Sequence, residues 1–446
     1  MYADHRGVCW RWVVVTSLCA VFGFNALGGA GEESLDGVSV QVLIKQLGSD
    51  SRGERLGAER ELIRRGTGVL EELPSPEEKF PVGVREALLR VRTEIEQRGA
   101  IESVRPSQVT VSGRMSLRKV LEEMERQTGN RLDTSGLTAT ELNEEREIEL
   151  ERETYWRAIE EVSRAFRVRL RTDAGKPLEL VASATEDPPR TGTGQGVDLS
   201  SSVRVEWMGN EVREQTGVGE MVRARLQFVL EPRLRGLYGT FRPREFLLTT
   251  DRGTKLEPHD PGATFEIPCG EGGKVLEIGL DFDLPMNEQP RLLQLRGAGD
   301  LEIAAGEERF EFKRLGIREP QGMRKGNVAV TFETEPTEEN DAKLKRFGIL
   351  VRYDTAGPPF ESHRLWIFHN RTFVTLENGQ EILPAGYETV LQQGRIVGLK
   401  YDFPLTNEEL RGAWFIYMAP TRIVSERVEF RFPAARISEG EISPAK

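Results

Sequence analysis

In the C-terminal half of the chain, every second residue is apolar over several separate runs, and this pattern constrains the fold more than any other feature. The clearest runs are Leu226, Phe228 and Leu230; Ile278, Leu280, Phe282 and Leu284; Val328, Val330 and Phe332; and Val428, Phe430 and Phe432. Such alternation is typical of strands that bury one face. Turn signals such as Asp251-Arg252-Gly253 and Asn378-Gly379 separate the runs. The region is therefore predicted to be antiparallel β structure.

The same region is duplicated. Four landmarks recur in the same order: Phe228–Pro232 with Phe332–Pro336, Asp251–Pro258 with Glu377–Pro384, Gly279–Pro285 with Gly398–Pro404, and Glu308–Phe312 with Glu426–Phe430. Each copy resembles an immunoglobulin-like sandwich in its size and in its expected number of strands. We predict two β-sandwiches, over 203–315 and 327–436, with a linker at 316–326 and a tail at 437–446.

A second, shorter duplication lies over 104–183. Each half reads as a strand, an amphipathic helix and a second strand. Ser116 is placed to cap the first helix and Gly129 to end it. Matched positions are Glu122, Glu123, Arg126, Arg131 and Leu132 with Glu160, Glu161, Arg164, Arg169 and Leu170. Two such βαβ units predict one small sheet with two helices on one face. Residues 184–202, which lack apolar periodicity, are predicted to be a flexible linker.

The segments Val109–Leu132 and Tyr155–Leu170 resemble the short N-terminal domain of secretins and TonB-dependent transducers. In that family a strand, a helix ending in a Thr-Gly turn and another strand recur twice. The resemblance implies a protein-interaction module outside the cytoplasm, without catalysis. Neither a secretin ring domain nor a transducer barrel is recognisable in the rest of this chain.

Residues 38–99 have a helical period. Val40, Leu43, Ile44 and Leu47 fall on one helix face. A second helix is predicted over 52–65, with Leu56, Leu62 and Ile63 inward and Gly66 at its end. A third follows with Val84, Leu88, Val91 and Ile95 inward. The run from Leu43 to Gly66 resembles a HEAT-type repeat, which implies protein–protein contact. A helical cap or spacer is the alternative interpretation.

Residues 1–30 have the composition of a secretory signal peptide. Arg6 and Arg11 precede an apolar run from Trp12 to Leu27, and small residues follow, with Ala30 before the expected cleavage point. The alternatives are an uncleaved signal anchor and a lipid attached to Cys19. The whole layout resembles exported envelope proteins of planctomycete-type bacteria. We therefore expect the protein to be periplasmic, secreted or on the cell surface.

Composition narrows the function classes. The formal net charge is −11, which disfavours nucleic acid and anionic lipid as partners. Signal cleavage would leave Cys269 as the one cysteine, so the mature fold is expected to have no internal disulfide. No later segment is long and apolar enough to span a membrane. The fold class predicted is multidomain α+β, with N-terminal helical hairpins, a small duplicated βαβ domain and two antiparallel β-sandwiches.

No catalytic motif was found, and no catalytic residue, metal ligand or cofactor is predicted. His363 and His369 lack the spacing of a zinc pair. Asp281 and Asp283 share a strand face and could bind calcium. Lys400 replaces Asp281 in the second copy, however, and this argues against a calcium site. A candidate binding patch consists of Glu361, His363, Arg364, Trp366 and His369, because Trp and Arg favour interfaces. The acid pairs Glu122-Glu123 and Glu160-Glu161 are interpreted as solvated charge on exposed helix faces.

These patterns favour an exported, non-catalytic binding or scaffold protein of the bacterial envelope that contacts other proteins or a surface polymer. An accessory component of a secretion or assembly apparatus is the first alternative. A carbohydrate-binding protein using aromatic residues such as Trp366, Tyr387 or Trp414 is the second. A hydrolase comes last.

Overall fold

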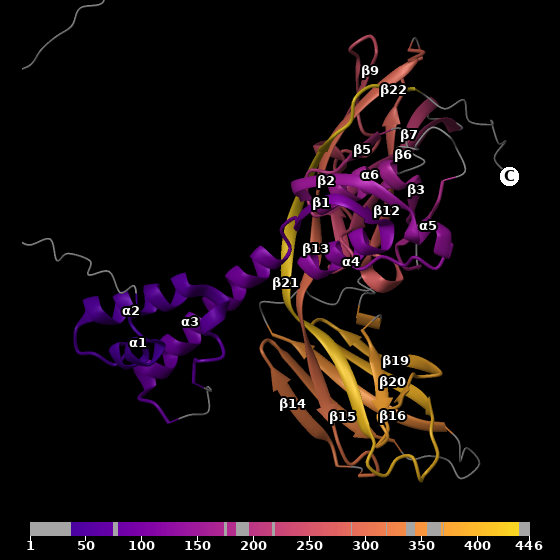
Figure 1. The fold of residues 1–446 in the computed structure, drawn as a ribbon. Coiled ribbons are helices and arrows are strands. Elements are labelled where there is room, and N and C mark those ends of the chain that lie inside the picture. The colour runs from indigo at the N-terminus through magenta and orange to yellow at the C-terminus, as the bar shows by residue number, and fades with distance from the viewer. Residues whose placement is uncertain are drawn as a thin grey trace, which may run out of the picture. The chain divides into compact units, whose positions relative to one another are not determined.

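The computed structural model is a mixed α/β structure in which most sheets are antiparallel (Figure 1). It describes residues 37–74, 79–173, 176–183, 196–215, 219–286, 288–317, 319–335, 344–354, 367–368 and 370–436. The expected signal (1–30) and tail (437–446) lie outside these residues. The chain divides into two compact units, Met1–Ile95 and Glu96–Lys446. Within the described ranges, no helix is both long and apolar enough to cross a bilayer.

The first unit is helical. Its elements are α1 (Val40–Gln46), α2 (Arg52–Arg65), the short 3-10 helix η1 (Gly66–Val69) and the start of α3 (Val82–Ser103). The Ser51 side chain caps α2 by accepting a hydrogen bond from the Glu54 N–H, and Gly66 ends it with a φ of 69°. The predicted bounds of this helix, 52–65, are confirmed.

One inward position was predicted wrongly in α2. Leu56 is 45% exposed, whereas Ala58 and Leu62 are fully buried against α1 and α3 residues. Ala58 and Leu62 are four residues apart and share a helix face, but Leu56 is two residues from Ala58 and points to the other side. The prediction that Leu56 faces inward was wrong because it used only the hydrophobic character of the residue and not its position on the helix face.

Acidification is expected to destabilise this helical unit through Glu61. Hydrogen bonds from Arg64 and Arg65 lower the pKa of Glu61 from 4.5 to about 2. A lowered folded-state pKa contributes stability above the unfolded value, and that stability is lost as the pH falls from about 5 toward 2. Glu61→Gln should flatten this pH dependence when unfolding free energies from urea titrations are compared across that range. Glu71→Gln, at an exposed position, is the matched control and should keep the wild-type slope.

The second unit begins with an α/β module, defined here as residues 104–183. Its elements are β1 (Gln108–Ser116), α4 (Leu117–Thr128), α5 (Ala139–Asn143), β2 (Glu145–Thr154), α6 (Tyr155–Phe166), β3 (Val168–Arg171) and β4 (Glu179–Ala182). Ser116 caps α4 by accepting a hydrogen bond from the Lys119 N–H, and Gly129 ends it in the left-handed conformation. Both end signals of this helix are confirmed.

The module does not form the single sheet that we expected. In the described residues β1 pairs with β2 and β3 pairs with β4, in two separate antiparallel pairs. A single parallel bridge joins Asp133 to Glu179 on β4. The extended residues after α4 and the strand after α6 therefore meet around β4. Because β4 lies outside the duplicated pattern, the repeat gave no sign of this arrangement.

Three larger sheets follow in the described part of the chain. The four-stranded sheet has the order β12-β7-β6-β5 and the five-stranded sheet the order β14-β15-β16-β20-β19. A nine-stranded sheet has the central path β10-β9-β13-β21-β17-β18, and β8, β11 and β22 pair at its sides. The strands are β5 (Gly196–Asp198), β6 (Val203–Gln215), β7 (Gly219–Leu230), β8 (Arg235–Phe241), β9 (Leu247–Thr250), β10 (Lys255–Leu256), β11 (Phe265–Pro268), β12 (Val275–Asp283), β13 (Leu292–Phe312), β14 (Gln321–Lys325), β15 (Val328–Thr334), β16 (Leu344–Tyr353), β17 (Thr372–Thr375), β18 (Glu381–Ile382), β19 (Gly386–Gln393), β20 (Ile396–Pro404), β21 (Trp414–Arg431) and β22 (Ala435–Arg436). Short 3-10 helices, η2 (Pro243–Glu245) and η3 (Glu271–Gly273), lie in the connections.

The long strands β13 and β21 pair antiparallel along nearly their whole length (Figure 1). They run through two β regions, of which the first contains the four-stranded sheet and the second contains the five-stranded sheet. The first β core lies between the four-stranded sheet and one half of the nine-stranded sheet, and it includes Val428, Phe430 and Phe432. The second β core lies between the five-stranded sheet and the other half, and it includes Phe310 and Phe312. Each core thus contains residues from the other predicted copy.

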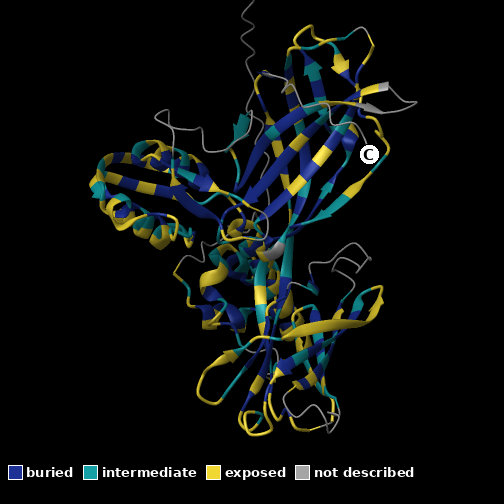
Figure 2. Cartoon of the chain, turned by 90° about the vertical axis from the view of Figure 1, so that its right-hand side faces the viewer, coloured by how far each residue is buried: buried dark blue, intermediate teal, exposed yellow. Residues whose placement is uncertain are grey.

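The two cores therefore do not divide at the expected boundary. The expected linker at 316–326 contains β14, and residues 196–198 of the other expected linker form β5. Register shifts near Ala304 and Gly306 mark a bulge between the two halves of β13. Inward residues are odd-numbered before it (Leu301, Ile303) and even-numbered after it (Phe310, Phe312). An extra residue at a bulge changes which alternate side chains face inward, so one strand serves both cores. Figure 2 shows buried and exposed residues alternating along many of the strands.

Three of the four repeat landmarks occupy matching places, and one does not. The turns at Gly253 and Gly379 both close hairpins, β9–β10 and β17–β18, with φ values of 84° and 85°. Likewise β12 matches β20 and β13 matches β21. However, β7 lies next to β12, whereas β15 is separated from β20 by β16. The structural counterpart of β7 is therefore β16, and the Phe228–Phe332 match was wrong because alternation is common to all such strands.

Candidate functional site

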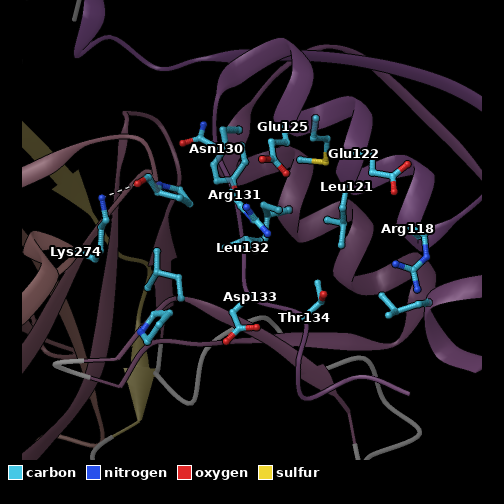
Figure 3. Close-up of a pocket in the computed structure, with 17 residues that line it drawn as sticks. Arg118, Leu121, Glu122, Glu125, Asn130, Arg131, Leu132, Asp133, Thr134 and Lys274 are labelled. Carbon is cyan, nitrogen blue, oxygen red and sulfur yellow. Dashed lines mark hydrogen bonds between the residues drawn. The ribbon is translucent and has the colours of Figure 1, made fainter. Parts of the chain in front are cut away.

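A groove in the α/β module is a concave site that brings together residues from α4, α6 and the segment after α4. Its cavity has a volume of about 600 Å³. One side is α4, the opposite side is the extended segment 130–134, and Pro232 and Lys274 of the first β region close one end. Figure 3 shows Arg118, Leu121 and Glu122 along one side, with Lys274 at the far end.

The lining of the groove is amphipathic. Its apolar residues are Leu121, Met124, Leu132, Leu142, Tyr155, Ile159, Pro177, Leu178 and Pro232. Leu117, Val120 and Met124 form the buried stripe of α4. Leu121 lies beside this stripe, packs against the core of the module and is partly exposed at the groove. The sequence carried no separate signal for the groove, because Leu121 reads as part of the same apolar pattern as Leu117, Val120 and Met124.

Charged side chains of both signs stand along the groove. They are Arg118, Glu122 and Glu125 on α4, and Arg131 and Asp133 on the opposite segment. No ion pair joins Arg118, Glu122, Glu125 or Arg131 to any residue in the described ranges. By contrast, Glu123 faces away from the groove and pairs with Arg126 through two hydrogen bonds. The charges of Arg118, Glu122, Glu125 and Arg131 are therefore available to a ligand.

One buried carboxylate fastens the α/β module to the first β region. Glu231, just after β7, is fully buried. It accepts hydrogen bonds from the Ser107 N–H at 2.9 Å, the Ser107 hydroxyl at 2.7 Å, the Asn130 amide at 3.0 Å and the Arg233 Nε at 2.8 Å. Arg233 in turn donates to the backbone carbonyls of Ser103 and Arg105. Charge-assisted bonds of this kind are stronger than neutral ones, so the wall of the groove is rigidly held.

The module also covers the outer face of the four-stranded sheet. Val229 and Val275 point away from the first β core and join the core of the module. The Trp156 Nε1 donates to the Ser202 carbonyl at 3.1 Å. Arg204, 1% exposed, lies 3.5 Å from Glu160 and 3.4 Å from Glu206. Glu160 is thus mostly buried beside a cation, and its interpretation as a solvated residue was wrong.

Two polar groups of the groove are withdrawn from solvent, Tyr155 fully and Lys274 in part. The Tyr155 hydroxyl has no hydrogen-bond partner in the described residues, and burial, followed by the charge of Glu231, raises its pKa well above 10. The Lys274 Nζ donates to the Pro232 carbonyl at 2.5 Å and to the Leu234 carbonyl. Burial, assisted by the nearby positive charge of Arg235, lowers the pKa of Lys274 to about 8.

The five residues of the candidate binding patch lie outside the described residues: Glu361, His363, Arg364, Trp366 and His369. The other aromatic candidates are not brought together. Tyr387 is on β19 of the five-stranded sheet, whereas Trp414 begins β21 of the nine-stranded sheet with the Lys313 ammonium 4.3 Å from its ring centre.

The remaining chemical candidates are engaged in other contacts. Asp281 accepts hydrogen bonds from Arg223 at 2.7 and 2.5 Å, and the Asp283 carboxylate lies 2.8 Å from His259. Burial raises the pKa of the Cys269 thiol to about 12, so the thiolate form is suppressed. Across the part of the chain that the structure describes, no cluster of His, Cys, Asp or Glu is arranged to hold a metal ion.

Comparison with protein-family models found no match, and comparison with curated proteins found none either.

Proposed function

We propose that the chain is an exported, non-catalytic binding or scaffold protein of the bacterial envelope, and that the groove of the α/β module holds a partner. The groove is the observation that carries the proposal. It combines an apolar lining with four charges that no residue in the described ranges pairs with, and the Glu231 network holds its wall in place. Unpaired charge beside apolar surface is typical of an interaction site.

The test is capture of envelope proteins by the immobilised chain, comparing wild type with Glu122→Arg. We expect this variant to lose about tenfold or more of the captured partner, because it reverses a charge on the groove. Glu123→Arg is the matched control, since Glu123 is adjacent but faces away, and it should capture as wild type does. Equal capture by all three proteins would overturn the proposal.

The export part of the proposal rests on residues 1–30. Expression in a diderm bacterium should deliver the protein outside the cytoplasm, and N-terminal sequencing should place cleavage after Ala30. Retention in the cytoplasm with an intact N-terminus would contradict it.

An accessory role in secretion or envelope assembly is the second candidate. It is supported by the resemblance of 104–183 to the secretin and transducer module and by the repeated strand–helix order there. Glu122→Arg, introduced into the gene in its own organism, should then impair export of other proteins. Carbohydrate binding has less support, because Tyr387 and Trp414 lie on different sheets.

A further inference from the structure

We infer that the groove takes an extended segment of a partner polypeptide, which pairs with the backbone of Leu132 as an added β-strand. This inference rests on the proposed binding function and specifies its ligand.

The first argument is an open backbone edge. The Asp133 N–H donates to the Leu178 carbonyl at 2.9 Å, and the Asp133 carbonyl accepts from the Leu180 N–H at 2.8 Å. Successive residues of an extended chain direct their backbone groups to opposite sides. Leu132 therefore presents its N–H and C=O away from β4, and in the described residues neither group forms a hydrogen bond. Leu132 also lines the groove, so this open edge is accessible from the cavity.

The second argument is the Tyr155 hydroxyl. It is buried, lines the groove and lacks a partner in the described residues. A buried polar group without a hydrogen bond costs free energy, and a ligand that supplies an acceptor recovers it. The backbone carbonyl of an added strand is such an acceptor. A peptide backbone therefore satisfies both features of the groove, the open edge at Leu132 and the unpaired hydroxyl of Tyr155.

The third argument is the sign of the charges. The two positive charges of Arg118 and Arg131 balance the two negative charges of Glu122 and Glu125. The groove therefore favours neither a polyanion nor a polycation. A glycan would need an exposed aromatic face for stacking, yet Tyr155, the aromatic residue of the lining, is 1% exposed. An extended polypeptide can place apolar side chains on the lining and charged ones beside the opposing charges.

The experiment uses the mature full chain and linear peptides selected on it from a random peptide display library. For a selected peptide, two N-methylated series are made, one at odd and one at even positions. In an added strand only alternate amides face the receptor, so one series should lose binding by about tenfold or more and the other should keep it. Hydrogen exchange at the Leu132 amide should slow on binding. Glu122→Arg should weaken binding, whereas Glu123→Arg should not.

The outcomes separate this inference from the proposed function. Equal effects of the two N-methylated series, or unchanged exchange at Leu132, would overturn strand pairing even if Glu122→Arg still reduced capture of an envelope partner. Failure to select any linear peptide, together with Glu122-dependent capture of a folded partner or a glycan, would also overturn it and leave the groove as a binding site. Loss of both effects would overturn the proposed function as well.

Discussion

Deletion of residues 427–446 is expected to unfold the first β core while the second β core keeps its structure. The deleted segment belongs to the second sequence copy, but Val428, Phe430, Phe432 and Ala435 are buried in the first β core. Phe415, Tyr417 and Ala419 remain, and these β21 residues pack in the second β core. Removing a buried Phe costs about 3–5 kcal/mol, so losing two of them consumes most of the stability of an ordinary domain.

Hydrogen exchange distinguishes the two cores. Amides of β6, β7 and β12 should lose protection in the deletion variant, and those of β15, β16 and β20 should keep it. Because deletion is a large change, a matched pair of point variants adds a second readout. Phe430→Ala should destabilise the first set of strands by about 3–5 kcal/mol, and Phe415→Ala the second set. If the deletion or Phe430→Ala opened β15 and β16 first, each copy would form its own core, contrary to the structure.

Replacement of Glu231 by Ala is expected to release the α/β module from the first β region. The change leaves the Ser107 N–H, the Asn130 amide and the Arg233 guanidinium without their shared acceptor. Breaking a buried, charged network from one side typically costs about 3–5 kcal/mol. Thermal unfolding should then separate into two transitions, and the module should melt in the first. Trp156 should report this first transition, because its indole N–H donates to the Ser202 carbonyl only while the module is docked.

Two further variants define the cause. Glu231→Gln keeps the size of the side chain but loses its charge toward Arg233, so its effect should be intermediate. Glu123→Ala removes an exposed pair on α4 and should change stability by less than about 0.5 kcal/mol. A single, unshifted transition in Glu231→Ala would show that other contacts hold the module.

The candidate site shows why a sequence reveals only part of a binding surface. Glu122 and Glu123 read as one acid pair, although α4 turns the first toward the groove and the second toward Arg126. In the matching pair, Glu160 is mostly buried and lies beside the buried Arg204, so it does not face a groove as Glu122 does. Identical local patterns therefore acquired different roles from residues far away in the chain.

By itself, the sequence determined the elements that depend on nearest neighbours. Helix α2 begins after Ser51 and ends before Gly66, and the β9–β10 and β17–β18 turns close at glycines, because capping and turn geometry act over a few residues. Tertiary structure decided which core each strand serves and where the groove lies. The alternation in β21 reads the same whichever core it faces, so that choice depends on its pairing with β13. The groove joins residues from Arg118 to Lys274, and such distant contacts leave no local pattern in the chain.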